Sequence, residues 1–407
     1  EEGQQNEYEL AQIPDVSGGL VSLAPLDGAI QVLIGGYDFS LNQFNMVTQA
    51  RRQAGSNIKP FVYSAAFNKD YTPASMINDM PIVEADITAE NFWRPKNDSD
   101  KYAGPTSLRR ALTLSKNTVS VRLVREIGAR YTKKYLEDIG FPGKHMSPYL
   151  SLALGSASFT PLEVATGYAT LANGGYKVAP YFIQRIEDAN GRILFQAQPL
   201  EVCRSCEETI ELQMQQALEN DIRLASVATD STLTESAPVE SDLLLLETPT
   251  PEFVNIPQFP IDENKIAPRV IEARNHYLVN NILQDVIHKG TAWRTLYNSK
   301  SSLLKRQDLA GKTGTTNDAK DAWFSGYNLN HVATAWVGFS DHEKKLGSRE
   351  FGGKAALPIW QKYMELTLAD TSPSYFERPE GLVTVRIDPQ SGLLATSYTT
   401  KPKFELF

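Results

Sequence analysis

The stretch DLAGKTGTTNDAKDAWFSGYNLNHVATAWVGFSD, residues 308–341, contains three runs in which apolar and polar residues alternate. Segments rich in Asn and Asp separate the runs, and these residues favour tight turns. Alternation with a period of two is typical of half-buried strands. The stretch therefore predicts three antiparallel strands that follow one another as a meander.

Strand pairs are also expected towards both ends of the chain, each around a turn dipeptide. They lie at 18–36 around Asp27-Gly28, at 182–196 around Asn190-Gly191 and at 382–397 around Ser391-Gly392. Between them, apolar residues recur every three or four positions, which predicts helices. The expected helices span 56–68, 106–114, 117–138, 275–288 and 356–368.

The clearest helix signal follows Thr160. Pro161 suits the first turn, Glu163 completes a capping box with Thr160, and Gly174-Gly175 end the helix. Strands on both sides of a helical middle predict an α+β fold, with a central antiparallel sheet sandwiched by helices.

Acidic charge is concentrated in one segment of the chain. The 407 residues carry a net charge of −8, and residues 201–263 alone hold fourteen Asp and Glu against two Arg. This balance predicts no nucleic-acid partner. Residues 201–265 mix acids with Ser, Thr and Pro, so we expect a partly flexible insertion with a short helix inside 207–225.

The ends of the chain are polar. Residues 1–13 read as a linker, and they show neither a signal region nor an anchor. Because the first residue is glutamate, we expect a mature or trimmed portion of a longer protein. No apolar run approaches the length that a bilayer crossing requires.

Cys203 and Cys206 are the two cysteines of the sequence and form a C-x-x-C. Such a pair is compatible with a local disulfide, two free thiols, half of a metal site or a redox pair. A zinc site needs two further ligands, and no second C-x-x-C or close His pair supplies them. A local structural pair is therefore the default, and no metal is expected.

Three short segments point to chemistry. They are Ser56-Asn57-Ile58-Lys59, Ser115-Lys116-Asn117 and Lys312-Thr313-Gly314-Thr315. Each alone matches many sequences by chance, but the order S-x-x-K, S-x-N, K-T-G is the motif set of penicillin-binding proteins and serine β-lactamases.

The first segment has a physical rationale. A serine hydroxyl is a weak nucleophile until a base removes its proton, and Lys59 lies one helical turn after Ser56. Burial and a neighbouring cation lower the pKa of a lysine, and Lys312 is the expected cation. Lys59 would then be neutral often enough to act as the base. The helix start at Ser56 also favours developing negative charge.

Around these motifs the sequence resembles the transpeptidase domain of class A (bifunctional) penicillin-binding proteins. The similar stretches are RQAGSNIKPFVYSAAF, GPTSLRRALTLSKNTVSVRL, LALGSASFTPLEVATGYATLANGG and DLAGKTGTTNDAKDAWFSGY. The resemblance implies the penicillin-binding/serine β-lactamase-like fold. It places a transpeptidase domain at 14–200 and 266–400, the acidic insertion at 201–265 and a C-terminal tail at 401–407.

The resemblance also implies roles for the motif residues. Ser56, Lys59 and Ser115 would be catalytic, with Ser115 relaying a proton, and the backbone N–H groups of Ser56 and Thr315 would form the oxyanion hole. The substrate-binding residues would be Asn117, Lys312, Thr313, Gly314 and Thr315. Asn117 would bond substrate and Lys59, Gly314 would leave room for the substrate backbone, and Lys312 with the two threonines would bind a terminal carboxylate.

The implied activity is a peptidoglycan D,D-transpeptidase that cross-links stem peptides ending in D-Ala-D-Ala through a Ser56 acyl-enzyme. No metal or organic cofactor is expected, and β-lactam antibiotics would be covalent inhibitors. The family's location is extracytoplasmic, on the periplasmic side of the bacterial inner membrane. A membrane anchor and a glycosyltransferase domain are expected in the full-length protein.

Three alternatives accompany this interpretation. A β-lactamase needs a positioned carboxylate for fast deacylation, and no E-x-x-L-N stretch lies between the second and third motifs. A D,D-carboxypeptidase, which uses water as the acceptor, shares all three motifs. A non-catalytic β-lactam sensor normally leads to a signalling helix, and the C-terminal KPKFELF offers none.

Overall fold

The structure is a computed structural model that describes residues 12–85, 92–230 and 261–407. Most of the expected linker at 1–13 lies outside the described residues. The chain divides into two compact units, Glu1–Pro199 with Pro268–Phe407, and Leu200–Ala267. Among the described residues, no helix has both the length and the apolar character that a membrane crossing requires.

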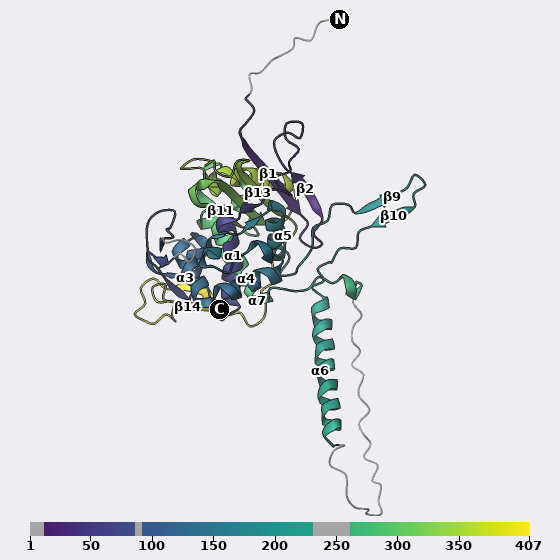
Figure 1. Ribbon diagram of the computed structural model, residues 1–407. Coiled ribbons are helices and arrows are strands. Elements are labelled where there is room, and N and C mark those ends of the chain that lie inside the picture. The colour runs from purple at the N-terminus through teal and green to yellow at the C-terminus, as the bar shows by residue number, and fades with distance from the viewer. Residues whose placement is uncertain (1–11, 86–91, 231–260) are drawn as a thin grey trace, which may run out of the picture. The chain divides into compact units, whose positions relative to one another are not determined.

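A five-stranded antiparallel sheet is the centre of the first unit (Figure 1). The strand order is β11-β12-β13-β1-β2, and the predicted meander forms three adjacent strands of it. The predicted hairpin around Gly28 supplies the other two, with Gly28 at a φ of 83°. The strands are β1 (Val16–Leu23), β2 (Ile30–Ile34), β11 (Ala310–Thr315), β12 (Asp321–Tyr327) and β13 (Val332–Phe339).

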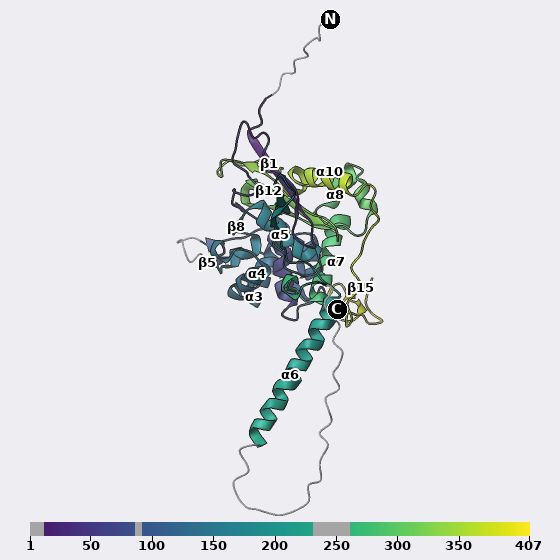
Figure 2. The same ribbon diagram turned by 90° about the vertical axis from the view of Figure 1, so that its right-hand side faces the viewer.

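Helices cover both faces of this sheet. Side chains alternate between the two faces along each strand, and both faces present aromatic side chains that pack against helices. On one face, the Phe324 ring packs 4.7 Å from the Trp360 ring of α10 (Leu357–Thr367). On the other face, the Tyr327 ring lies 6.4 Å from the Tyr168 ring of α5 (Pro161–Ala172). Figure 2 shows α5 and α10 on opposite sides of the strands. The α+β sandwich that the sequence predicts is confirmed.

Most predicted helices form, and one divides. The capping box between Thr160 and Glu163 is present at the start of α5. The single helix expected over 117–138 is instead α3 (Asn117–Ile127) and α4 (Ala129–Ile139), because Gly128 adopts a φ of 97° and ends α3. The other helices of this unit include α1 (Lys59–Phe67), α2 (Leu108–Thr113), α7 (Ala273–Lys289), α8 (Trp293–Asn298) and α9 (Gly352–Ala355).

Short strand pairs connect these helices. The pairs are β3 (Arg52–Gln53) with β8 (Ser158–Phe159), β4 (Met76–Asp79) with β7 (Gly104–Ser107), β5 (Glu84–Ala85) with β6 (Phe92–Trp93), and β9 (Arg185–Glu187) with β10 (Ile193–Gln196). The last pair is the hairpin that the sequence predicts around 190–191.

The C-terminal strand pairing differs from the prediction. β14 (Thr384–Ile387) pairs with β15 (Lys403–Leu406), whereas the expected partner run after Gly392 contributes only a bridge at Leu394. The tail expected at 401–407 therefore contains a strand. Its Glu405 is buried and binds Arg109 of α2, a contact 296 residues apart that no local pattern reveals.

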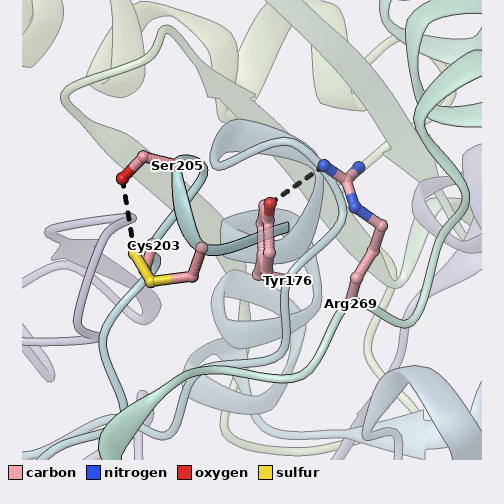
Figure 3. The surroundings of a disulfide bond; sticks show 5 residues. Tyr176, Cys203, Ser205 and Arg269 are labelled. Atoms are coloured by element: carbon pink, nitrogen blue, oxygen red, sulfur yellow. Dashed lines mark hydrogen bonds between the residues drawn. A yellow bond between two sulfur atoms is a disulfide. The ribbon is translucent and has the colours of Figure 1, made fainter. Parts of the chain in front are cut away.

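The second unit contains one long helix, α6 (Cys206–Asp230). The first and last segments of this unit lie next to each other. The Glu201 N–H donates to the Lys265 carbonyl at 2.7 Å, and the Ala267 N–H donates to the Glu201 carbonyl at 2.8 Å. Cys203 and Cys206 form a local disulfide at the start of α6 (Figure 3). Figure 3 also draws a bond of the first unit, from the Arg269 guanidinium to the Tyr176 hydroxyl.

Candidate active site

The S-x-x-K segment forms the helix start that the sequence predicts. Ser56 lies in a 3₁₀ turn, η1 (Gly55–Ile58), which continues into α1 at Lys59. Pro60 occupies the first turn of α1, where its missing N–H costs no hydrogen bond. Lys59 is fully buried and Ser56 is partly exposed, so the hydroxyl can meet a substrate while the amine is kept from water.

A buried ion pair ties this segment to the central sheet. The Arg52 guanidinium donates to the Asp321 carboxylate at 2.6 Å, and the Trp336 indole donates to the same oxygen at 2.9 Å. The Trp323 indole donates to the Gln53 carbonyl. The chain that leads into η1 is therefore fixed against β12 and β13. Sequence reasoning did not single out Arg52, which sits in no motif.

Glycines bring η1 into direct contact with the end of β11. Gly55 has a φ of 55°, and a Cβ atom there would lie 2.6 Å from the Thr315 carbonyl oxygen. A Cβ atom on Gly314 would lie 2.9 Å from the Ala54 carbonyl oxygen and 3.1 Å from Cγ of Asn57. The close approach of Ala54 and Asn57 thus leaves no space for a side chain at position 314, and the expected room for the substrate backbone beside Gly314 stays a prediction.

Ser115 joins the two lysines of the motifs. The Lys59 amine donates to the Ser115 carbonyl at 2.8 Å and to its hydroxyl at 3.3 Å. The Lys312 amine, from β11, donates to the same hydroxyl at 2.9 Å. Ser115 has a φ of 56°, a backbone conformation that is strained for a residue other than glycine. The structure thus brings S-x-x-K, S-x-N and K-T-G together around one hydroxyl.

Asn117 completes the surroundings of Lys59. Its side-chain oxygen accepts from the Lys59 amine at 2.6 Å, and its side-chain nitrogen donates to the Lys96 carbonyl at 2.7 Å. These two bonds fix which end of the amide faces the lysine. Lys59 therefore has three oxygen acceptors within hydrogen-bond distance, which matches the three donors of an ammonium group.

Thr313 and Thr315 lie on the opposite face of β11 from Lys312, because side chains alternate along a strand. The Thr313 hydroxyl is 2.7 Å from the hydroxyl of Thr291, just after α7. The Thr315 hydroxyl accepts from the Gly352 N–H of α9 at 3.1 Å. Strand β11 is at the edge of the sheet, so one side of its backbone has no strand neighbour among the described residues.

The Ser56 hydroxyl makes no hydrogen bond to any described residue. Its expected base, Lys59, is instead engaged by Ser115 and Asn117. Catalytic hydrogen bonds are often longer before substrate binds and tighten in the complex. In the free site, the Lys59 amine is therefore bonded to Ser115 and Asn117 and not to the hydroxyl of Ser56.

The two buried amines repel one another. Burial lowers the pKa of Lys59 to about 7, against the opposing charge of Asp98. Burial also lowers the pKa of Lys312 well below its usual value, and the charge of Lys59 lowers it further. The Lys312 amine has two acceptors, the Ser115 hydroxyl and the Thr313 carbonyl at 2.9 Å. Because the Lys59 amine has three, Lys59 is the better place for the shared charge in the free site. The sequence-based expectation has the charge on Lys312.

Among the described residues, neither a metal-binding group nor the cavity beside α2 identifies this site. Among the described residues, no group of three or more His, Cys, Asp or Glu is arranged to hold a metal ion. A cavity of about 850 Å³ lies between α2, α7 and the β14–β15 pair, and none of the eight motif residues lines it. The site is identified by the motif side chains that converge on the Ser115 hydroxyl and the Lys59 amine.

The aromatic residues beside K-T-G belong to the core. Trp323, Phe324 and Tyr327 are fully buried on β12. The buried Tyr168 hydroxyl donates to the Asn57 carbonyl at 2.8 Å, and the Asn57 amide donates to Ser325 at 3.1 Å. These contacts clamp η1 against α5 and the sheet. No sequence signal marks Tyr168 as a neighbour of the site.

This fold and this grouping of motifs are those of the class that comprises penicillin-binding proteins and serine β-lactamases. A family model for the penicillin binding protein transpeptidase domain matches residues 18–229. The chain belongs to the penicillin-binding protein transpeptidase family, and its resemblance to the class A members is confirmed.

Penicillin-binding proteins 1A are among its relatives. The chain is 42% identical to the Pseudomonas aeruginosa protein, over 97% of this chain and 45% of that protein. It is 39% identical to the Escherichia coli protein, over 97% of this chain and 47% of that protein. The crystal structure of the Haemophilus influenzae protein superimposes with a TM-score of 0.78 at 34% identity, over 98% of this chain and 54% of that one. The chain thus spans about half the length of these relatives.

Proposed function

We propose that this chain is a peptidoglycan D,D-transpeptidase that cross-links stem peptides ending in D-Ala-D-Ala through an acyl-enzyme on Ser56. The observation that carries the proposal is that the Lys59 and Lys312 amines both donate to the Ser115 hydroxyl. Lys59 directly follows the 3₁₀ turn that contains Ser56. Family membership supports an acyl-transferring enzyme of peptidoglycan synthesis. The eight motif residues are proposed to perform its chemistry.

The first half-reaction forms an ester. The Ser56 oxygen attacks the carbonyl carbon between the two D-Ala residues, and neutral Lys59 takes the hydroxyl proton. The backbone N–H groups of Ser56 and Thr315 stabilise the oxyanion, a contribution of about 10²–10³ in rate for each donor. The C–N bond then breaks, Ser115 relays the proton to the departing nitrogen, and D-Ala leaves as the amine.

Substrate binding itself makes Lys59 a base in this proposal. The terminal carboxylate binds at the edge of β11, where the hydroxyls of Thr313 and Thr315 approach it from one face of the strand and the Lys312 amine from the other. A carboxylate raises the pKa of a neighbouring amine, so the shared charge moves from Lys59 to Lys312. Lys59 becomes neutral at the moment when Ser56 has a substrate to attack.

The second half-reaction transfers the acyl group. An amine of a neighbouring stem peptide attacks the ester carbonyl, its proton passes back through Ser115 and Lys59 to the Ser56 oxygen, and a new amide forms. The free edge of β11 suits an extended peptide, whose backbone can pair with the strand. The Asn117 amide bonds the substrate backbone on the opposite side.

Product analysis tests the proposal against its alternatives. The chain is incubated with a stem pentapeptide ending in D-Ala-D-Ala and an acceptor stem peptide, and the products are separated by chromatography and mass spectrometry. A cross-linked dimer, absent with Ser56→Ala, is the expected result. Trimmed tetrapeptide alone identifies a D,D-carboxypeptidase. Acylation by benzylpenicillin without any peptide turnover identifies a β-lactam sensor.

The remaining proposals concern the whole protein. β-Lactams mimic the D-Ala-D-Ala terminus and would acylate Ser56 as covalent inhibitors. Because peptidoglycan lies outside the cytoplasm, we place the domain on the periplasmic side of the inner membrane. The full-length protein is proposed to carry a membrane anchor and a glycosyltransferase domain. The domain boundaries at 14–200, 201–265 and 266–400 remain predictions.

A further inference from the structure

A buried carboxylate, that of Asp79, binds residues beside Asn117 of the S-x-N segment. Asp79 is the last residue of β4, and its side chain is fully buried. One carboxylate oxygen accepts from the Thr118 hydroxyl at 2.5 Å and the other lies 2.9 Å from the Lys116 amine. Asp79 thus binds the residues on either side of Asn117. Burial raises the pKa of Asp79, but bonds from Thr118, Asn97 and Lys116 outweigh it and hold that pKa below its usual value.

A buried amide supplies the helix cap that α3 lacks. The N-cap residue of α3, Lys116, makes no capping bond with its own side chain. The Asn97 side-chain oxygen accepts from the backbone N–H groups of Asn117 at 2.8 Å and Thr118 at 3.4 Å. Those donors would otherwise be unpaired at the start of the helix. Asn97 therefore caps α3 from a segment 20 residues earlier in the chain.

Asp79 also orients this cap. The Asn97 side-chain nitrogen donates to Asp79 at 2.7 Å and to the Lys101 carbonyl at 3.0 Å, so the amide oxygen must face α3. The Ala103 N–H donates to the second Asp79 oxygen at 3.0 Å. With the Asp79 side chain fully buried and Asn97 only 4% exposed, the pair is largely shielded from water.

This network ends at the catalytic groups. Asn117, whose backbone Asn97 caps, presents its side-chain oxygen to Lys59, and Ser115 directly precedes the capped turn in a strained conformation. Strained backbone persists only where the surroundings over-determine it. A loosened start of α3 would let Ser115 relax and Asn117 move away from the amine.

We propose that Asp79 and Asn97 are positioning residues for the acyl transfer, which fix the start of α3 and so hold Ser115 and Asn117 against Lys59. The inference rests on the proposed function of the same site. Neither residue touches the nucleophile or belongs to a motif. Misplacement of a catalytic group by about 1 Å can cost on the order of 10²-fold in rate, so the effect is large enough to measure.

The test compares acylation in the wild-type chain and in Asp79→Asn. The second-order rate constant for acylation by benzylpenicillin is expected to fall about 10²-fold. The new amide nitrogen would face the Lys116 amine and the Ala103 N–H, which are both donors, so the network breaks. Asn97→Ala removes the cap alone and is the second variant, which keeps the test decisive if Asp79→Asn fails to fold.

The pH profile separates positioning from stability. Loss of the Asn117 acceptor disfavours the charged form of Lys59 and so lowers the pKa of its amine. In both variants, the fall of the acylation rate constant on the acidic side should therefore occur at lower pH. The other charges that act on this amine, Lys312 and Asp98, are unchanged by the substitutions. A role in folding alone would lower the melting temperature and leave the profile in place.

Asp308→Asn is the matched control. Asp308 is another fully buried carboxylate, which binds Arg306, the Asn328 amide and the Ser374 N–H and contacts none of the motif residues. We expect it to lose stability without a change in the acylation constant or the profile. Wild-type rates and profiles in both Asp79→Asn and Asn97→Ala would overturn the inference. A wild-type chain that benzylpenicillin fails to acylate would instead refute the proposed function.

Discussion

At the scale of single residues, the site depends on two buried amines that share one hydroxyl. Ser115 lies within 3.3 Å of the Lys59 amine and 2.9 Å of the Lys312 amine. Two positive charges at this spacing are unfavourable in a buried site, so one amine must be neutral. Which one is neutral depends on what binds beside Lys312.

The first prediction concerns pH. Neutral Lys59 is the base, and burial lowers its pKa to about 7. The second-order constant for acylation by benzylpenicillin should therefore be high above pH 7 and fall as the pH drops through that value, because this constant reports the free protein. Stopped-flow acylation between pH 5 and pH 9, a range of about two units on either side, measures it. A flat profile would remove Lys59 as the base, and Lys59→Gln should lose about 10²–10⁴-fold.

The second prediction concerns the close approach at Gly55. In Gly55→Ala, the new Cβ atom would lie 2.6 Å from the Thr315 carbonyl oxygen, so β11 and η1 must separate. Acylation should be lost together with roughly 1–3 kcal/mol of stability from backbone strain. Gly191→Ala is the control, because Gly191 also has a positive φ of 80° but has open space around it. Equal acylation in the two variants would refute the close approach as a requirement.

At the scale of elements, local chemistry is visible in the sequence and long-range pairing is not. The capping box at Thr160 and the meander at 308–341 were predictable because their signals lie within a few residues. The break at Gly128 was missed because apolar periodicity continues across it. The pairing of β14 with β15 was missed because the Ser391-Gly392 dipeptide is a strong local signal for a turn. Strand β15 is stabilised instead by a long-range contact with α2, which leaves no local signal in the sequence.

The third prediction tests that C-terminal strand. Glu405→Gln removes a charge that pairs with Arg109, which is bonded on its other side to Asp285. Hydrogen bonds to charged groups contribute about 1.5–3 kcal/mol, so the free energy of unfolding should fall by a similar amount in urea titrations. Glu377→Gln, at an exposed position, should change it little. Equal stability of the two variants would restore the interpretation of 401–407 as a tail.

At the scale of the whole molecule, three motif segments far apart in the sequence meet in one place. The sequence predicted their identity and order, because each carries a short pattern with a chemical meaning. It did not predict the groups that hold them, such as Arg52, Asp79 and Asn97, because single polar residues outside a motif have no distinguishing pattern. The close contact of Gly314 with Ala54 and Asn57 was not predictable for a related reason, since only the tertiary structure brings these segments together.

The fourth prediction concerns the second unit. The chain enters and leaves it at adjacent positions, with Glu201 bonded to Lys265 and Ala267, so a short Gly/Ser linker can replace residues 201–266. None of the eight motif residues lies in this unit. Acylation by benzylpenicillin should stay within about twofold of the intact chain, because distant independent sites do not couple. A large loss would make the insertion part of the active fold.

Intact-mass spectrometry after incubation with benzylpenicillin tests the central claim most directly, with the wild-type chain and Ser56→Ala side by side. The proposed mechanism predicts a stable adduct of one benzylpenicillin on the wild-type chain and none on the variant. An adduct on both chains, or on neither, would contradict it.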